Sequence, residues 1–143
     1  MNSRERVQAA IARQPVDRVP LGFYAVDHDT VERVLGRPTY VRNKIAVQVA
    51  LWEGRRDEVA ASLKADTVEV YRKIDCADLL LPKEAQLLPP KDYTPERPKR
   101  LDENRWEDRY GRIYQAVPFA NEIQCVYDPQ KGKREFSVAD FAG

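Results

Sequence analysis

The single histidine of the chain, His28, lies between two aspartates in the stretch Asp27-His28-Asp29. An imidazole changes its charge near neutral pH, and a neighbouring carboxylate can orient it or stabilise its charged form. His28 is therefore a candidate acid/base or hydrogen-bond donor to a substrate, with Asp27 as its partner. The alternative is that Asp29 caps a helix and His28 is a solvated loop residue. The sequence leaves both interpretations open.

A second group of charged residues, Arg72, Lys73 and Asp75, directly follows the segment 67–71 (TVEVY). Two cations and a carboxylate at the end of a predicted strand could meet the same rim as His28. Cations there would suit a substrate that carries carboxylate groups. The alternative is a solvated strand end with a local ion pair. With one histidine in the chain, we expect no metal site built from this chain alone.

The elements that would position His28 resemble the first half of a βαβ unit. Residues 19–26 (VPLGFYAV) are apolar on both faces, which is typical of a parallel strand covered on both sides. His28 follows the carboxyl end of this segment, where α/β folds gather reactive groups. Asp29 and Glu32 then match a capping box, and Gly36 is placed to end the helix.

Spacing predicts further helices and strands in the first part of the chain. Apolar residues recur at helical intervals over 3–13, 41–53 and 57–64, whereas 67–71 alternates with a period of two and predicts a second strand. The segment 76–82 (CADLLLP) is either a third short strand or the buried continuation of the second. Cys76 and Cys125 match no disulfide or zinc pattern, and we expect them to be buried free thiols.

The later part of the chain changes in composition. Half of the ten prolines fall within 82–98, which predicts an extended connector rather than a helix. Residues 105–117 alternate around Gly111, and 121–127 alternate again, which predicts a small antiparallel β element. Ser137 matches the start of a further helix. The predicted organisation is therefore 1–81 for the first helix and βα units, 82–104 for the connector, and 105–143 for the β element and helix start.

Composition argues against two classes of partner. The chain has 143 residues and a formal net charge of +1, so no bulk field attracts nucleic acid or an anionic membrane. The basic run 97–100 (RPKR) is bordered by acidic residues and predicts a solvated loop. No apolar run approaches the length of a membrane span, and the amino terminus does not match a signal peptide, so we expect a cytoplasmic location.

Several stretches resemble one family. The opening MNSRERVQAAIARQPVDRVPLGF resembles the start of the uroporphyrinogen decarboxylase superfamily, in which a helix with an R-E-R-V-x-A-A core leads to P-x-D-R-V-P and the first barrel strand. The stretches DTVEVYRKIDCADLLLP, WEDRYGRIY and SVADF are similar to later landmarks of less characterised members. The resemblance implies an α/β fold that is the amino-terminal part of a (β/α)8 TIM barrel, incomplete, with an inserted antiparallel β-hairpin element.

The resemblance also implies two enzyme activities for a complete barrel. Members decarboxylate a tetrapyrrole-type carboxylate substrate without a cofactor, or they transfer methyl groups between a corrinoid protein and a thiol with zinc. No cofactor is expected within this chain, and zinc ligands would lie in the later half of such a barrel. Where classical decarboxylases carry an R-Q-A-G-R element, this chain reads YAVDHDTVERVLGR.

Three hypotheses about function remain open at this point. In the first, the chain is the amino-terminal portion of a decarboxylase or methyltransferase and is inactive alone, because so few strands cannot close a barrel. In the second, it is one half of a split enzyme, completed by a partner chain or in a homo-oligomer. In the third, it is a small non-catalytic binding module. The expected roles are His28 as acid/base, Asp27 as its partner, and Arg72 and Lys73 as anion contacts beside Asp75.

Overall fold

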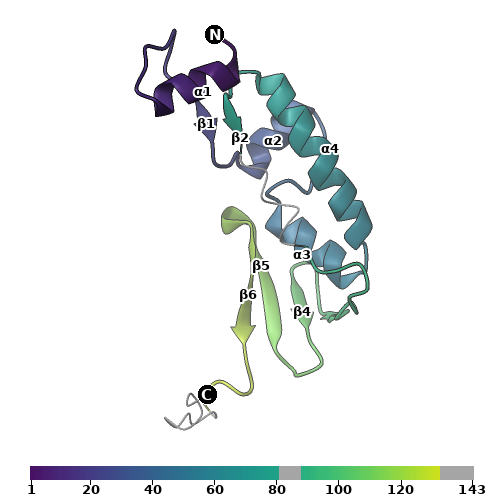
Figure 1. The fold of residues 1–143 in the computed structure, drawn as a ribbon. Helices are drawn as coiled ribbons and strands as arrows, with labels where there is room; N and C mark the ends of the chain where they lie inside the picture. The colour runs from purple at the N-terminus through teal and green to yellow at the C-terminus, as the bar shows by residue number, and fades with distance from the viewer. Residues whose placement is uncertain (81–87, 133–143) are drawn as a thin grey trace.

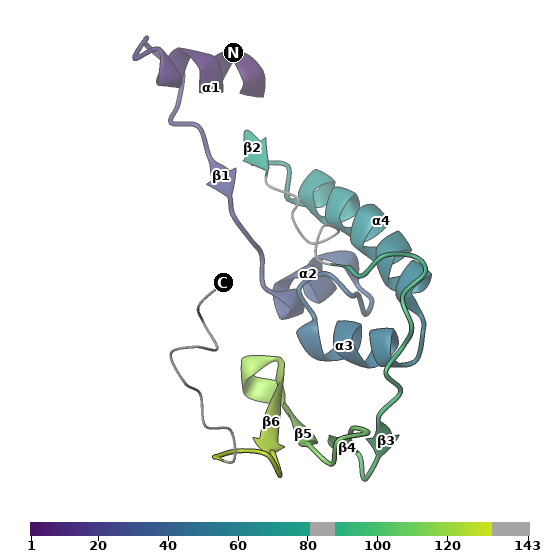
Figure 2. The ribbon, with the colours of Figure 1, turned by 60° about the horizontal axis from the view of Figure 1, so that its bottom comes forward.

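The computed structural model describes residues 1–80 and 88–132. A helical part with one short parallel strand pair leads into an antiparallel sheet (Figures 1 and 2). The elements are α1 (Ser3–Ile11), β1 (Gly22–Phe23), α2 (His28–Leu35), α3 (Lys44–Trp52), α4 (Arg56–Ile74), β2 (Leu79–Leu80), β3 (Lys99–Arg100), β4 (Arg105–Glu107), β5 (Ile113–Val117), the 3-10 helix η2 (Pro118–Ala120) and β6 (Glu122–Tyr127).

Helix α1 confirms the helix predicted at the amino terminus and begins with a capping box. The side chain of Asn2 accepts a hydrogen bond from the backbone N–H of Glu5, whose carboxylate accepts one from the backbone N–H of Asn2. These bonds satisfy two backbone donors at the start of the helix.

The strands β1 and β2 pair in parallel, with Gly22 opposite Leu79 and Phe23 opposite Leu80. The strand predicted over 19–26 is therefore confirmed over two residues only, and the segment 76–82 contains a short strand. The predicted burial of both faces of 19–26 is wrong, because Val19 is 75% exposed and Tyr24 is 69% exposed. Within residues 1–80 and 88–132 no further strand joins this pair, and the side chains of β2, Leu79 and Leu80, remain 60% and 41% exposed.

Helix α2 begins two residues earlier than the predicted capping box requires. His28 is its first residue and Asp27 is the N-cap, although the Asp27 side chain makes no capping hydrogen bond. The prediction that Asp29 caps the helix is wrong: Asp29 lies in the first turn and pairs with Arg33 at 3.4 Å. Gly36 ends the helix as predicted, at a φ of 73° that glycine adopts without strain.

Helix α4 replaces the predicted helix 57–64 and the predicted strand 67–71. It runs without interruption from Arg56 to Ile74, so the strand prediction is wrong. Val59, Leu63 and Val70 are all buried at helical spacing, which continues the apolar stripe through the β-branched stretch. Packing of this stripe against α2 and α3 outweighs the β propensity of 67–71.

The structure has two apolar cores, one among the helices and one between α3 and the sheet. The first core lies among α2, α3 and α4, and its buried members are Val31, Leu35, Val41, Ala50, Val59, Leu63 and Val70. In the second, Trp52 of α3 contacts the sheet through Trp106 and Tyr114, with ring centroids 5.5 and 5.9 Å apart. Trp52 therefore joins the helical part to the sheet.

The antiparallel sheet confirms the predicted β element and extends it by one strand. Its order is β3-β4-β5-β6, with a turn at Gly111 between β4 and β5. The basic run expected in a loop contributes its residues 99–100 to β3, where both remain exposed. Residues 88–98 form no helix or strand, in agreement with the predicted connector. Ser137 lies outside the described residues, and so does the helix predicted to start there.

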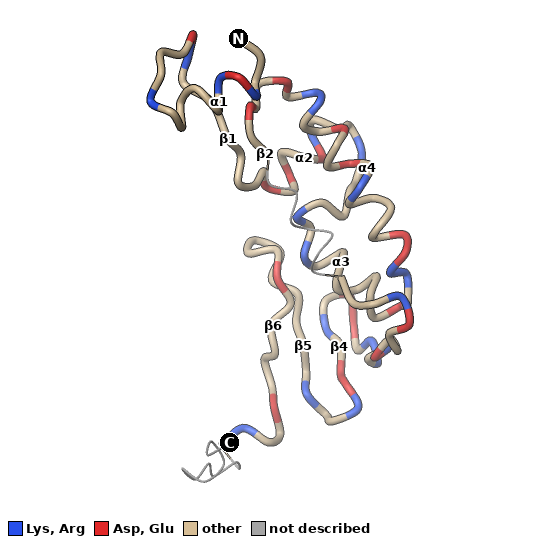
Figure 3. The backbone as a smooth tube through the Cα atoms, viewed as in Figure 1, with Lys and Arg blue, Asp and Glu red and all other residues tan. Residues whose placement is uncertain are grey.

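The two cysteines are exposed free thiols, so the prediction that they are buried is wrong. Cys125 lies on β6, an edge strand of the described sheet, opposite Tyr114. Positive and negative residues are interspersed along the backbone (Figure 3). In the described part of the chain, no helix is both long and apolar enough to cross a membrane.

An ionic cluster around the buried side chains of Arg6 and Asp78 joins α1 to the parallel strands. Arg6 donates hydrogen bonds to Asp17 at 2.6 and 2.8 Å and to Asp78 at 2.6 Å. Asp78, whose side chain is 0% exposed, also accepts from Arg18 at 2.6 Å and from the backbone N–H of Leu21 at 3.0 Å. The cluster thus joins two motifs of the opening stretch to the residue that precedes β2.

This cluster predicts that the protein loses stability in acid. The Leu21 N–H holds the pKa of Asp78 well below its usual value of 3.8, and Arg6 does the same for the pKa of Asp17. The unfolded chain therefore binds more protons as pH falls through about 4, and stability falls from there downward. We expect urea midpoints to be flat from pH 5 to 7 and to decrease steadily from pH 4 to 2. Equal midpoints at pH 6 and pH 3 would contradict this.

Candidate functional site

His28 lies at the point where the chain leaves β1 and enters α2. It is half-buried, and its Nδ1 lies 3.2 Å from the side-chain Nδ2 of Asn121. Asn121 is 93 positions away in sequence and lies between η2 and β6. The contact therefore joins the carboxyl end of β1 to the antiparallel sheet.

Asn121 is held by two backbone groups from the loop before α3 and the start of α3. Its Nδ2 donates to the carbonyl oxygen of Arg42 at 2.8 Å, and its Oδ1 accepts from the N–H of Ile45 at 3.3 Å. Both Asn121 and Arg42 have positive φ, at 48° and 61°. Asparagine is among the few residues other than glycine that adopt this conformation readily.

Asp27 and Arg42 place opposite charges next to His28. The Arg42 guanidinium lies 3.9 Å from the Asp27 carboxylate, and the Asp27 side chain is 83% exposed. This long, solvated ion pair contributes little stability, and a ligand carboxylate could replace Asp27 beside Arg42. In the described part of the chain, the partner of Asp27 is Arg42, whereas His28 contacts Asn121.

The predicted anion contacts lie elsewhere. Arg72 and Lys73 are in the last turn of α4 and Asp75 is its C-cap, so the prediction that they end a strand is wrong. They precede β2, whereas His28 follows β1, and the two strands are parallel. The two groups therefore lie at opposite ends of the strand pair. Lys73 contacts Glu69 at 2.9 Å.

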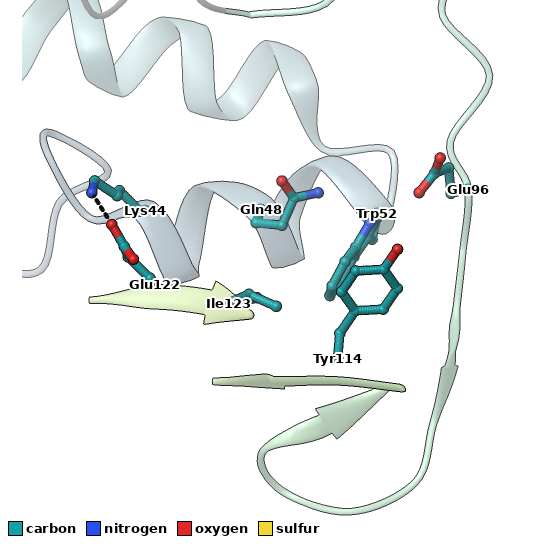
Figure 4. Close-up of a pocket in the computed structure, with 7 residues that line it drawn as sticks. All are labelled: Lys44, Gln48, Trp52, Glu96, Tyr114, Glu122 and Ile123. Atoms are coloured by element: carbon teal, nitrogen blue, oxygen red, sulfur yellow. Dashed lines mark hydrogen bonds and ion pairs between the residues drawn. The ribbon is translucent and has the colours of Figure 1, made fainter. Parts of the chain in front are cut away.

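A groove of about 420 Å³ runs between α3 and the sheet, close to the His28 junction. At one end Lys44 forms an ion pair with Glu122 at 2.6 Å. Glu122 directly follows Asn121 in the sequence. Figure 4 shows Trp52 and Tyr114 close together near the other end, with Glu96 across from them. The groove is lined by Lys44, Gln48, Trp52, Glu96, Tyr114, Glu122 and Ile123.

Two side chains that line the groove, Glu122 and Tyr114, have shifted pKa values that fix their protonation states near neutral pH. The hydrogen bond from Lys44 lowers the pKa of Glu122, so this carboxylate stays ionised and paired. Burial raises the pKa of Tyr114, which keeps its hydroxyl protonated as a hydrogen-bonding group. The groove is thus lined by the aromatic rings of Trp52 and Tyr114 and by polar side chains. The acid/base candidate, His28, is not among its lining residues.

Residues 1–80 and 88–132 contain no candidate metal site. No group of three or more histidine, cysteine, aspartate or glutamate side chains there is arranged to hold a metal ion. These residues therefore offer no ligand set for the zinc that the methyltransferase resemblance implies.

Sequence reasoning missed Arg42 and Asn121. Arg42 lies in the loop before α3 and resembles many other surface arginines in sequence. Asn121 carried one usable signal, because it follows a Pro-Phe-Ala turn and asparagine is common where a short helix ends at positive φ. Nothing local indicates that either residue approaches His28.

No family model, curated protein or solved structure matches the chain.

Proposed function

We propose that this chain forms the amino-terminal part of a uroporphyrinogen decarboxylase-like (β/α)8 enzyme that acts on a small molecule carrying carboxylate groups. Its contribution to the active site is His28 at the carboxyl end of β1, with Arg42 beside Asp27. The remaining strands come from further chain or from a partner subunit. Corrinoid-linked methyl transfer is the other reaction of this superfamily, and the experiment below distinguishes the two.

The uncovered parallel strand pair is the observation that carries this proposal. Parallel strands are normally covered on both faces and continue into a larger sheet. Here Leu79 is 60% exposed and Tyr24, just after β1, is 69% exposed. Helices α2, α3 and α4 connect the two adjacent parallel strands, and a parallel pair joined through a helical crossover is the unit from which such a barrel is built. Additional strands and helices would cover these apolar side chains.

The ionic cluster supports the proposal by assigning a physical role to the opening motif. Arg6 belongs to the R-E-R-V segment, Asp17 and Arg18 belong to P-V-D-R-V-P, and all three contact the cluster around Asp78. The spacing of these motif residues is explained by the need to hold α1 against the start of β1 and β2. We therefore assign this motif a structural role, and we assign the reaction to residues at the carboxyl end of β1, such as His28.

The residues around His28 suit a carboxylate substrate. Decarboxylation breaks the bond between the carboxylate carbon and the adjacent carbon and releases carbon dioxide. The adjacent carbon keeps the electron pair and takes up a proton. Arg42 supplies a cation that can bind a substrate carboxylate. His28 supplies a group that can donate a hydrogen bond or a proton. These roles require that the substrate enters at the carboxyl end of β1.

We expect His28→Ala to reduce kcat of the native protein by about 10²–10⁴-fold, the usual contribution of a general acid or base. Arg33→Ala, on the exposed face of the same helix, is the matched control and should leave kcat unchanged. The assays are carbon dioxide release from uroporphyrinogen and methyl transfer from methylcobalamin to a thiol. Wild-type kcat in a folded His28→Ala variant would refute the role of His28.

The mass of the protein purified from its source tests the barrel itself. A mass near that of a complete barrel, in one chain or in a complex, is the expected result. A monomer of this chain alone that unfolds cooperatively, with neither activity, would refute the proposal and favour a binding module. A complex with a second chain that supplies the missing strands would identify a split enzyme.

A further inference from the structure

We infer that Asn121 sets the tautomer of His28 and thereby presents its Nε2–H as a hydrogen-bond donor toward the substrate. This inference rests on the proposed function for the identity of that substrate, a carboxylate, but the tautomer itself follows from contacts within the chain. Asn121 acts through His28 and is a positioning residue.

The orientation of the Asn121 amide follows from backbone groups whose polarity cannot change. The Arg42 carbonyl oxygen only accepts hydrogen bonds, so the side-chain atom 2.8 Å from it must be the NH2 group. The Ile45 N–H only donates, so the atom 3.3 Å from it must be the amide oxygen. A flipped amide would place two acceptors together and two donors together.

The state of His28 follows from this orientation. The Asn121 NH2 group has two hydrogens; one binds the Arg42 carbonyl and the other points to Nδ1 of His28 at 3.2 Å. Nδ1 must therefore accept, and the proton of the neutral ring lies on Nε2. Among the described residues no side chain or backbone group makes a hydrogen bond to Nε2, so its N–H is available to a ligand.

The position of Asn121 depends on the sheet. Its αL conformation ends η2, and the next residue, Glu122, begins β6 and pairs with Lys44 of α3. The amide therefore stays at a defined place only while β6 lies against α3. This gives the antiparallel sheet a role at the site, because its docking orients an imidazole that belongs to the first βα unit.

A carboxylate is the ligand chemistry that fits the pair of donors. The Nε2–H of neutral His28 can donate to one carboxylate oxygen, while Arg42, 3.9 Å from Asp27, can take up the negative charge. A cationic ligand would find no acceptor on the ring, since Nδ1 is already occupied by Asn121.

Nitrogen-15 NMR of the imidazole tests the inference directly, because the chain has one histidine. At pH 8 the native protein should show only the Nε2–H tautomer, whereas the same protein in urea should show the usual mixture of both. Asn121→Asp replaces the donor by an acceptor of the same shape and should move the proton to Nδ1. The control Asn104→Asp makes the same change in the β3–β4 turn and should leave the spectrum as in wild type.

A tautomer mixture in the native protein equal to that in urea would overturn the inference, as would an unchanged Nε2–H signal in a folded Asn121→Asp variant. If Asn121→Asp does not fold, the wild-type comparison with urea still decides. These outcomes do not depend on turnover. A protein with the expected tautomer and no decarboxylase activity would refute the proposed function and leave the role of Asn121 intact.

Discussion

Replacing Trp52 by alanine should lower the free energy of unfolding by about 3–5 kcal/mol, the range found when a buried tryptophan is truncated. Trp52 is 7% exposed at the end of α3 and belongs to the buried cluster with Trp106 and Ala116. Its ring also contacts Tyr114 edge-on. Truncation would open a cavity where the helical part meets the sheet, and neither part can collapse fully to fill it.

The loss should be largest in the sheet. Trp106 and Tyr114 contact the helical part through Trp52, while the first core among α2, α3 and α4 does not contain this residue. Amide exchange should therefore accelerate in β4 and β5 more than in α4.

A matched control for Trp52→Ala is Phe119→Ala. Phe119 is 95% exposed in η2, so removing its ring should change the free energy of unfolding by less than about 0.5 kcal/mol. Urea denaturation of both variants, followed by circular dichroism, measures the difference. Equal midpoints for the two variants would show that Trp52 does not join the helices to the sheet.

Replacing Asp78 by asparagine should produce the second large effect, the release of α1 from the strand pair. The buried carboxylate accepts hydrogen bonds from Arg6, Arg18 and the N–H of Leu21. An amide of the same shape removes the charge and turns NH2 hydrogens toward arginine donors, which leaves the buried guanidinium of Arg6 with fewer acceptors. The thermal midpoint should fall, and the acid dependence described above should weaken.

Asp75→Asn is the matched control, because it makes the same change three residues earlier on an exposed C-cap. The structure places no hydrogen bond or ion pair on the Asp75 side chain within the described residues, so this variant should match wild type. Limited proteolysis near 12–20 and amide exchange of α1 report the release directly. Wild-type protection of α1 in Asp78→Asn would show that the cluster does not hold this helix.

Local signals in the sequence predicted the elements whose structure depends on near neighbours. The helix end at Gly36 and the turn at Gly111 each involve bonds or dihedral angles within a few residues. The alternation in the β hairpin and the position of His28 after β1 were likewise visible in residue order alone.

The site could be predicted only in part from the sequence. His28 was identified because a single histidine beside aspartates, after an apolar strand, is a local pattern. Its neighbours Arg42 and Asn121 were not, since they come from a loop 14 residues later and from a turn 93 positions away. Arg72 and Lys73 were placed at the wrong end, because their position depended on a strand that does not form.

What the sequence determined by itself were therefore short-range features: the end of α2 at Gly36, the turn at Gly111 and the alternation of the hairpin. Tertiary structure decided the rest, because packing energy is shared among distant residues. It made 67–71 part of α4 through the buried stripe of Val59, Leu63 and Val70, despite β-branched side chains. It also placed Asn121 against His28, since only the docking of the sheet on α3 brings these two residues together.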